Sequence, residues 1–99
     1  MFDATAPPYS MTLMTPEGIV YAGEVISMVA PGASGKLGIL NQHMPLLCLM
    51  NSGTLVCLEK GGSWLHFEIS EGVLDVTPEG VDVIVDRAER VPISLAPRF

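Results

Sequence analysis

The sequence predicts an all-β fold, a single β-sandwich or flattened barrel of about eight to ten short strands. Turn residues recur about every ten positions, and the apolar residues between them alternate with a period of two rather than 3.6. The chain has 99 residues, which suits one domain. Leu, Ile, Val and Phe make up 30 of them, enough for a hydrophobic core without disulfides or a structural metal.

The first half of the chain contains short strands between turns. Residues 1–10 are expected to be a flexible, proline-bearing extension, followed by a strand over 11–15. Val and Ile enrichment over 20–30 predicts two short strands separated by a bend or bulge at Gly23 and Glu24. The segment 31–35 is expected to be a loop.

Two further short strands, 37–40 and 46–50, lie in a charge-free run of 22 residues, 37–58. On length alone this run could span a membrane. Asn, Gln, Pro, Ser and Gly interrupt it, however, and a lipid-facing helix would leave their polar groups unsatisfied. We therefore expect two buried strands here and no membrane insertion. Residues 1–10 contain no basic segment followed by an apolar core, so we expect neither a signal peptide nor a transit peptide.

The second half shows the clearest alternation. Residues 54–59 and 64–70 predict a hairpin joined by a Lys-Gly-Gly-Ser turn, and residues 81–86 predict a further strand. In the second strand of the hairpin we expect one face to be core and the other solvent-exposed; the expected solvent-facing residues are His66, Glu68 and Ser70. Regularity ends at Arg87, and 91–99 is expected to be a tail.

One phrase, Thr-Pro-Glu-Gly, occurs twice, at 15–18 and 77–80. Pro in second place and Gly in fourth place are typical of a tight turn. Each copy is therefore expected to join two neighbouring strands.

Composition excludes several classes of function. The formal net charge is −6 and the pI is near 4.6, so phosphate backbones should be repelled and nucleic acid is not an expected partner. Only 16% of residues are charged, against about 25% in an ordinary soluble domain. This deficit favours a surface that is partly covered by another protein.

No motif predicts catalysis, a cofactor or a metal. The segment 32–36 (Gly-Ala-Ser-Gly-Lys) has two residues between its glycines and a Leu after its Lys, so it does not match a phosphate-binding loop. His43, Cys48, Cys57 and His66 are not at ligand spacings, and we expect the two cysteines to be buried, reduced thiols. No nucleophile elbow or paired carboxylates can be recognised.

Two side chains have an alternative to a purely structural role. Lys60, at a hairpin tip of a small acidic β-protein, is where a lipoyl or biotinyl carrier domain would be modified, although its flanking residues match neither carrier family. This carrier domain is the alternative function. Met44 lies in a polar loop beside His43 and is the best methionine candidate for an interface.

In their order along the chain, six phrases resemble the epsilon subunit of F-type ATP synthases, specifically its amino-terminal β-sandwich domain. The resemblance assigns residues 11–90 to that domain. The phrases lie at 15–25, 31–40, 43–47, 60–62, 70–76 and 83–90.

The resemblance implies a non-catalytic rotor subunit of the central stalk that links the gamma subunit to the membrane ring of c subunits and couples proton or sodium flow to ATP synthesis. It implies a peripheral position on the cytoplasmic face of the bacterial plasma membrane, a monomer when alone, and no cofactor.

The resemblance also implies two contact regions. The residues that match the gamma-facing region are Thr15, His43, Met44, Leu46 and Cys48. Those that match the segment facing the c ring are Gly32, Ala33, Ser34, Gly35 and Lys36, where Lys36 replaces a common Glu. The helical hairpin that follows this domain in typical family members has no counterpart in the sequence, so we expect neither ATP binding nor self-inhibition.

Overall fold

The computed structural model describes residues 6–41 and 43–92, and in this part of the chain it has nine β-strands and no helix. No described helix could therefore serve as a membrane span. The strands are β1 (Tyr9–Thr15), β2 (Gly18–Gly32), β3 (Gly35–Leu40), β4 (Leu46–Met50), β5 (Gly53–Glu59), β6 (Trp64–Ile69), β7 (Gly72–Thr77), β8 (Gly80–Val85) and β9 (Ala88–Val91). Residues 1–5 of the expected extension and 93–99 of the expected tail lie outside the described residues. Tyr9 and Ser10 belong to β1 and Val91 belongs to β9, so the strands reach further at both ends than expected.

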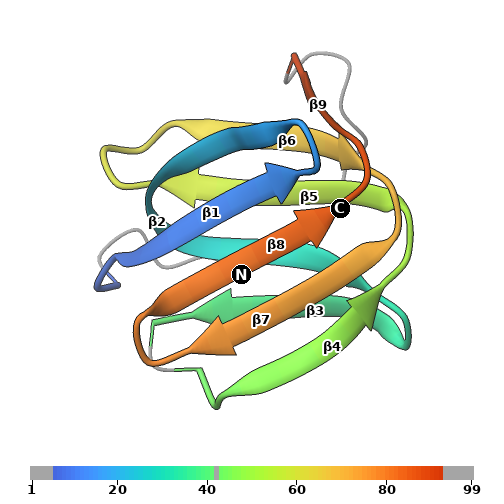
Figure 1. Cartoon of the computed structure of the whole chain (residues 1–99). Helices are drawn as coiled ribbons and strands as arrows, with labels where there is room; N and C mark the ends of the chain where they lie inside the picture. Colours follow the sequence, from blue (N-terminus) through green and yellow to red (C-terminus); the bar gives the residue numbers. More distant parts are fainter. Residues whose placement is uncertain (1–5, 42, 93–99) are drawn as a thin grey trace.

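The strands form two layers that share β2 (Figure 1). In one layer β4, β7, β8, β1 and the first half of β2 lie side by side, with β1 and β8 parallel and the other pairs antiparallel. In the other, β3, the second half of β2, β5, β6 and β9 are all antiparallel. A single pair, Gly32 with Met50, joins β2 to β4, which gives the sandwich the partly closed form of a flattened barrel.

The expected two strands over 20–30 are wrong, because β2 is one strand of 15 residues. Its first half pairs with β1 and its second half with β5, and the register shifts between Val25 and Ser27 where it passes from one layer to the other. A β-bulge bends a strand and increases its twist, which allows one strand to serve both sheets.

The core lies between the two layers and is made by alternate residues of the strands. Met11 and Leu13 of β1, Phe67 of β6 and Leu74 of β7 are each at most 2% exposed. Strand β8 has the period-two pattern of a strand with one buried face: its three valines are buried, and Asp82 and Asp86 beside them are exposed. Burial of Val, Leu or Phe side chains contributes roughly 1.5–3 kcal/mol each, so this layer of apolar side chains is the main source of stability.

The two Thr-Pro-Glu-Gly phrases form matching turns, as predicted. In the first, Thr15 Oγ1 accepts a hydrogen bond from the amide of Glu17 at 3.2 Å and donates to the carbonyl of Gly18 at 3.4 Å. In the second, Thr77 Oγ1 makes the equivalent contacts at 3.2 and 3.3 Å. The first turn joins β1 to β2 and the second joins β7 to β8.

Three other expectations are corrected by the structure. The segment 31–35 is not an open loop but the tip of the β2–β3 hairpin, with Gly32 paired to Gly35. A ninth strand, β9, follows Arg87 and pairs with β6, although no regular pattern marks it in the sequence. Strand β4 is not buried on both faces, because Leu47 and Leu49 are 70% and 68% exposed.

His66 is also not on a solvent-exposed face. It points away from the core, yet it is only 9% exposed, and its outward-facing neighbours on β5, Val56 and Leu58, are buried as well. Its Nδ1 atom and the hydroxyl of Ser27 have no hydrogen-bond partner among the described residues. The alternation of apolar and polar residues along β6 predicts that His66 points away from the core. It does not predict whether neighbouring side chains cover that outer face.

Candidate protein-protein interface

A row of apolar side chains crosses the outer face of the first layer. Strand register places Leu49 of β4 opposite Val73 of β7, Val73 opposite Ile84 of β8, Ile84 beside Met14 of β1, and Met14 opposite Ile19 of β2. Leu49, Val73, Ile84 and Met14 point away from the core, since each lies next to a buried residue on its strand. Ile19 is paired with Met14 and is itself exposed. We call these five residues the apolar row.

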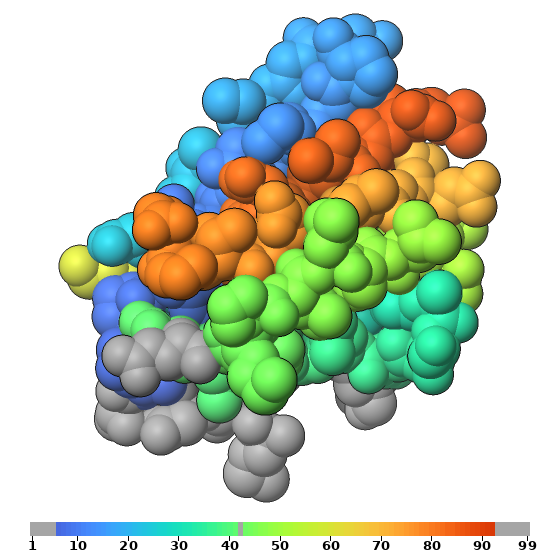
Figure 2. All heavy atoms as spheres, turned by 60° about the horizontal axis from the view of Figure 1, so that its bottom comes forward, coloured from blue at the N-terminus to red at the C-terminus, as the bar shows by residue number. Residues whose placement is uncertain are grey.

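The apolar row is accessible. Ile19 is 66% exposed, Leu49 68% and Ile84 44%, and Leu47, next to the row on β4, is 70% exposed. Figure 2 shows the strands that carry it, with β4 in green, β7 and β8 in orange and the β1–β2 turn in blue forming one continuous surface. Single exposed apolar side chains are ordinary, but a contiguous set across five strands indicates a protein-binding surface.

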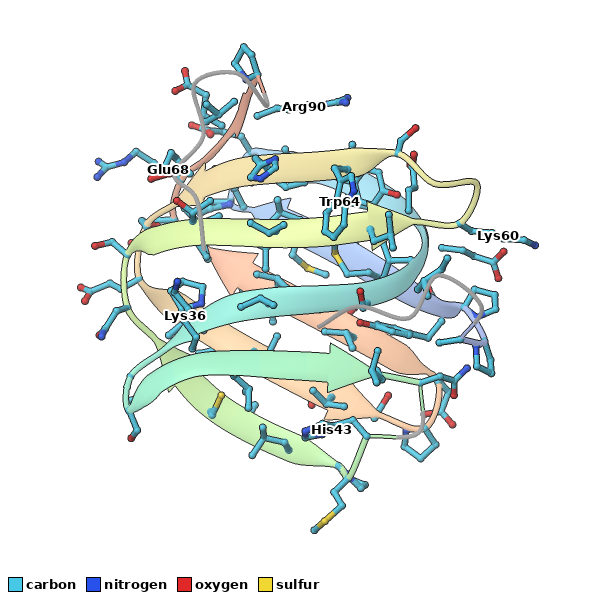
Figure 3. All side chains as sticks on the ribbon, turned by 180° about the vertical axis from the view of Figure 1, so that it is seen from behind. Lys36, His43, Lys60, Trp64, Glu68 and Arg90 are labelled. Atoms are coloured by element: carbon cyan, nitrogen blue, oxygen red, sulfur yellow. The ribbon has the colours of Figure 1, made fainter. Side chains whose placement is uncertain are left out.

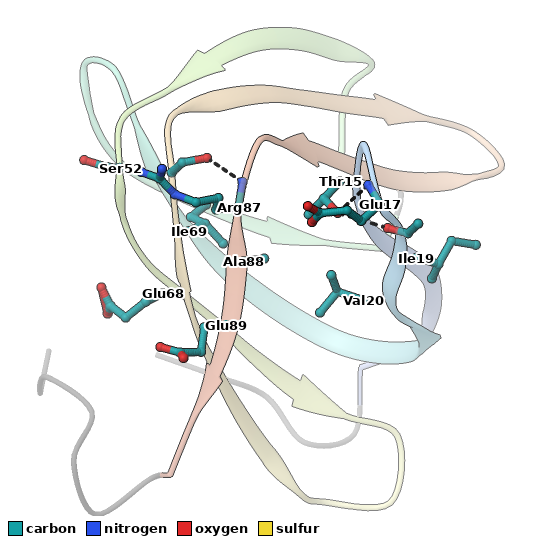
Figure 4. A pocket seen from close by; sticks show the side chains of 12 residues that line it. Thr15, Glu17, Ile19, Val20, Ser52, Glu68, Ile69, Arg87, Ala88 and Glu89 are labelled. Atoms are coloured by element: carbon teal, nitrogen blue, oxygen red, sulfur yellow. Dashed lines mark hydrogen bonds between the residues drawn. The ribbon is translucent and has the colours of Figure 1, made fainter.

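Two clefts lie at opposite ends of the sandwich. The larger, of about 600 Å³, lies between the β1–β2 turn and strands β6 and β9, and its charged lining residues are Glu17, Glu68, Arg87 and Glu89 (Figure 4). The smaller, of about 380 Å³, is lined by Tyr9, His43 and backbone-rich segments around Pro45 and Pro78. In neither cleft does a hydrogen bond among the described residues join a nucleophile to a base.

The shifted ionisable groups are structural. Burial raises the pKa of the Cys57 thiol to about 12, and the negative charge of Glu59 adds to the rise. Burial, together with a 2.7 Å hydrogen bond to Glu59, raises the pKa of Tyr21. Burial also raises the pKa of Tyr9, whose hydroxyl donates to the carbonyl of Ile39 at 2.6 Å. These groups stay protonated at neutral pH, so they act as donors or core side chains rather than as nucleophiles or bases.

No group of three or more His, Cys, Asp or Glu side chains that could hold a metal occurs in the described part of the chain. Both cysteines are free; Cys57 is buried, as expected, whereas Cys48 is only half-buried.

Residues 9–91 match the family model of the ATP synthase Delta/Epsilon chain β-sandwich domain. The chain belongs to this family. Among curated relatives it is similar to the ATP synthase epsilon chains of Desulforamulus reducens (39% identity over 80 residues) and Moorella thermoacetica (33% over 81 residues). These matches cover 81% and 82% of this chain and 60% of each relative, so it spans somewhat less than two-thirds of their length.

Two solved structures share the fold of this chain. A chain of the Euglena gracilis mitochondrial ATP synthase, in a structure of OSCP, F1 and the c-ring, superposes with a TM-score of 0.79 at 22% identity, covering 89% of this chain and 57% of that one. A chain from the central stalk and c-ring of the Tetrahymena thermophila enzyme superposes with a TM-score of 0.70 at 18% identity, covering 85% and 67%. At these identities the likeness concerns the fold.

The residues predicted to face gamma do not all lie together. His43, Met44, Leu46 and Cys48 are close in sequence, at the start of β4, and His43 lines the smaller cleft. Thr15 lines the larger cleft, at the other end of β1. The apolar row connects the two regions, because it runs from β4 to Met14, next to Thr15.

Within β4, the predicted residues point inward. Leu46 and Cys48 are half-buried and pack against the core, whereas Leu47 and Leu49 point outward. Met44, before the strand, is 77% exposed, and the ring of His43 has its Nδ1 2.8 Å from the carbonyl oxygen of Met44. Leu47, Leu49 and the rest of the apolar row were not singled out from the sequence. Every residue of β4 is apolar, so the sequence does not reveal which of its side chains point outward. Met14, Val73 and Ile84 become neighbours only through the register of their strands.

The residues predicted to face the c ring form the tip of the β2–β3 hairpin. Ala33, Ser34, Gly35 and Lys36 are exposed, and Gly32 is half-buried. The amide of Ala33 donates to the carbonyl of Leu49 at 3.2 Å, so the tip is tied to a strand of the apolar row. In Figure 3, Lys36 and Lys60 lie at opposite ends of the second layer.

Lys60 is exposed at the β5–β6 turn, where its ammonium group lies 3.3 Å from a carboxylate oxygen of Glu24. An exposed pair of this kind contributes little, typically 0–1 kcal/mol. Membership of the epsilon family gives no support to a carrier domain modified at this lysine.

Proposed function

We propose that this chain is a non-catalytic rotor subunit of an F-type ATP synthase, where it links the gamma subunit to the membrane ring of c subunits and helps couple ion flow to ATP synthesis. One observation supports this above all: a member of the epsilon family exposes an apolar row across a whole sheet face. A protein with such a face is suited to bind a large partner rather than to transform a small substrate.

We assign the apolar row to gamma, together with Leu47 and the predicted residues Met44 and His43 beside it. Aliphatic side chains at the centre of such a contact exclude water, and the polar rim sets its orientation. Thr15, at the other end of the row, extends the same surface. Leu46 and Cys48 contribute to this surface indirectly, because they pack against the core and hold β4 in position.

We assign the β2–β3 hairpin tip to the c ring. Its exposed Ser34 and Lys36 suit polar loops rather than an apolar groove. Because the tip is hydrogen-bonded to β4, the two proposed contacts are adjacent parts of one rigid surface. In this role the chain is a peripheral component on the cytoplasmic face of the bacterial plasma membrane.

Binding to gamma tests the proposal. The unaltered chain and the gamma subunit from the same source should form a 1:1 complex in size-exclusion chromatography with light scattering. Leu49→Glu should weaken it by about thirtyfold or more, because a carboxylate replaces a central apolar contact. Ser63→Glu is the matched control, since Ser63 is exposed in the β5–β6 turn of the other layer and lines neither cleft.

Circular dichroism should show that both variants fold, because both side chains point to solvent. If the unaltered chain forms no complex with gamma, the proposed function is wrong. If Leu49→Glu binds as tightly as Ser63→Glu, gamma binds elsewhere on the chain.

A further inference from the structure

Two aspartates lie side by side next to the apolar row. Asp75 of β7 is directly opposite Asp82 of β8, and this pair lies two residues along the strands from the pair Val73 and Ile84 of the row. All four side chains are on the outer face, and residues two apart on a strand are separated by about 7 Å. Asp82 is exposed and Asp75 is half-buried. We call these two aspartates the acidic pair.

Nothing in the described part of the chain neutralises the acidic pair. Its neighbours in the same row are Leu47 on β4 and Thr12 on β1, both uncharged. No hydrogen bond or ion pair to either carboxylate occurs among the described residues. Like charges directly opposite in a ladder destabilise a sheet, so the isolated chain gains nothing from this arrangement.

A second acidic pair offers a contrast. Glu68 and Glu89 are also directly opposite, on β6 and β9. There, however, Glu68 accepts a 2.5 Å hydrogen bond from the hydroxyl of Thr54, and Arg87 lines the same cleft as both glutamates. That pair faces its own compensating groups, whereas the pair at Asp75 and Asp82 faces outward beside an apolar surface.

Building on the proposed function, we propose that the protein which covers the apolar row presents a lysine or arginine side chain that lies between Asp75 and Asp82. A partner that contacts Val73 and Ile84 necessarily covers or borders the acidic pair. Burying carboxylates without a counter-charge is costly, so a partner without a cation at this point binds weakly. An arginine fork is well suited to engage both carboxylates.

The pair therefore selects among partners. The apolar row would accept any complementary apolar surface, whereas the acidic pair rejects one that is uncharged or acidic at this position. Affinity and selectivity are thus assigned to neighbouring rows of the same sheet.

The test compares Asp75→Asn/Asp82→Asn with Glu68→Gln/Glu89→Gln, which removes the same charge from the other layer. Each is titrated calorimetrically with the gamma subunit at about 20 mM and about 300 mM NaCl, where exposed charges are weakly and strongly screened. The aspartate variant should bind about tenfold more weakly at low salt and lose most of the salt dependence. The glutamate variant should bind like the unaltered chain.

A thermal melt separates this role from a structural one, because removing like-charge repulsion should leave the midpoint unchanged or raise it while binding weakens. Asp82→Arg should bind more weakly than Asp82→Asn, since it opposes the partner's cation. If the aspartate variant binds with unchanged affinity and salt dependence, this inference is overturned and the proposed function stands. If the unaltered chain does not bind gamma, both fall.

Discussion

Gly18 and Gly80 occupy the same place in the two Thr-Pro-Glu-Gly turns, with backbone φ angles of 131° and 146°. Both conformations disfavour a side chain. Their surroundings differ, because a Cβ at Gly80 would lie 2.6 Å from the carbonyl oxygen of Ser10, whereas one at Gly18 would meet nothing within 4 Å. The second turn is packed against β1 and the first stands free.

Alanine substitution should distinguish them. Gly18→Ala should lower the free energy of unfolding by about 1 kcal/mol through backbone strain, and Gly80→Ala by about 2–4 kcal/mol because the clash with Ser10 adds to it. Urea unfolding followed by circular dichroism measures both. Equal losses would mean that the β7–β8 turn moves away from β1 at little cost.

Neighbouring leucines of β4 have opposite environments, which illustrates what the sequence leaves open at the residue scale. Leu46 packs against the core and Leu47 is 70% exposed, yet both lie in one apolar run. Alternation between polar and apolar residues reveals which side of a strand is inward, and where every residue is apolar it reveals nothing. The residue pattern predicts a strand over 46–50, which is β4, but it does not predict which of its side chains point outward.

Among the strands, β6 and β8 were predictable because apolar residues alternate with His66 and Glu68 in β6 and with Asp82 and Asp86 around β8. Strand β9 was missed, since Ala-Glu-Arg-Val has no such pattern and is held by pairing with β6. Strand β2 was divided in two because Gly23 resembles a break. The continuous pairing of β2 with two layers is a tertiary property, as is the apolar row, which exists only once the register of five strands is set.

The β2–β3 hairpin makes a prediction at the element scale. A photo-cross-linking residue such as benzoylphenylalanine in place of Ser34 should form an adduct with the c subunit in membranes containing the assembled synthase, because Ser34 is exposed at the tip assigned to the ring. Ser63, exposed in the β5–β6 turn, is the matched control and should give no such adduct. Mass spectrometry of the cross-linked bands identifies the partner; adducts from both positions or from neither would contradict the assignment.

For the whole molecule, one buried thiol and two half-buried tyrosines predict loss of stability at alkaline pH. The pKa of Cys57 is raised to about 12 in the folded chain, and the pKa values of Tyr9 and Tyr21 are raised as well. A raised pKa means that the folded state holds its proton more tightly than the unfolded state. The resulting stability is complete below the unfolded pKa, near 9 for the thiol, and is lost as the pH rises from there towards the folded value.

Thermal melts between about pH 7 and pH 11 should therefore show a constant midpoint up to about pH 9 and a steady fall above it. Over that range the free energy of unfolding decreases by up to about 1.4 kcal/mol per pH unit for each linked proton. Cys57→Ala should begin from a slightly lower midpoint and fall less steeply between about pH 9 and pH 10, where the tyrosines of the unfolded chain are still protonated. A midpoint that stays level to about pH 11, or an identical slope in the variant, would contradict this account.

Strand β2 also has a mechanical meaning. It begins at the turn beside Ile19, at one end of the apolar row, and ends at Gly32, at the base of the hairpin tip, without leaving the extended conformation. A load applied at the tip therefore travels to the far edge of the opposite sheet along covalent bonds, which stretch far less than packed side chains. The bulge near Ile26 is a built-in point of flexure on this path. In a subunit that rotates with a central stalk, such a strand would carry tension directly between the hairpin tip and the edge of the opposite sheet.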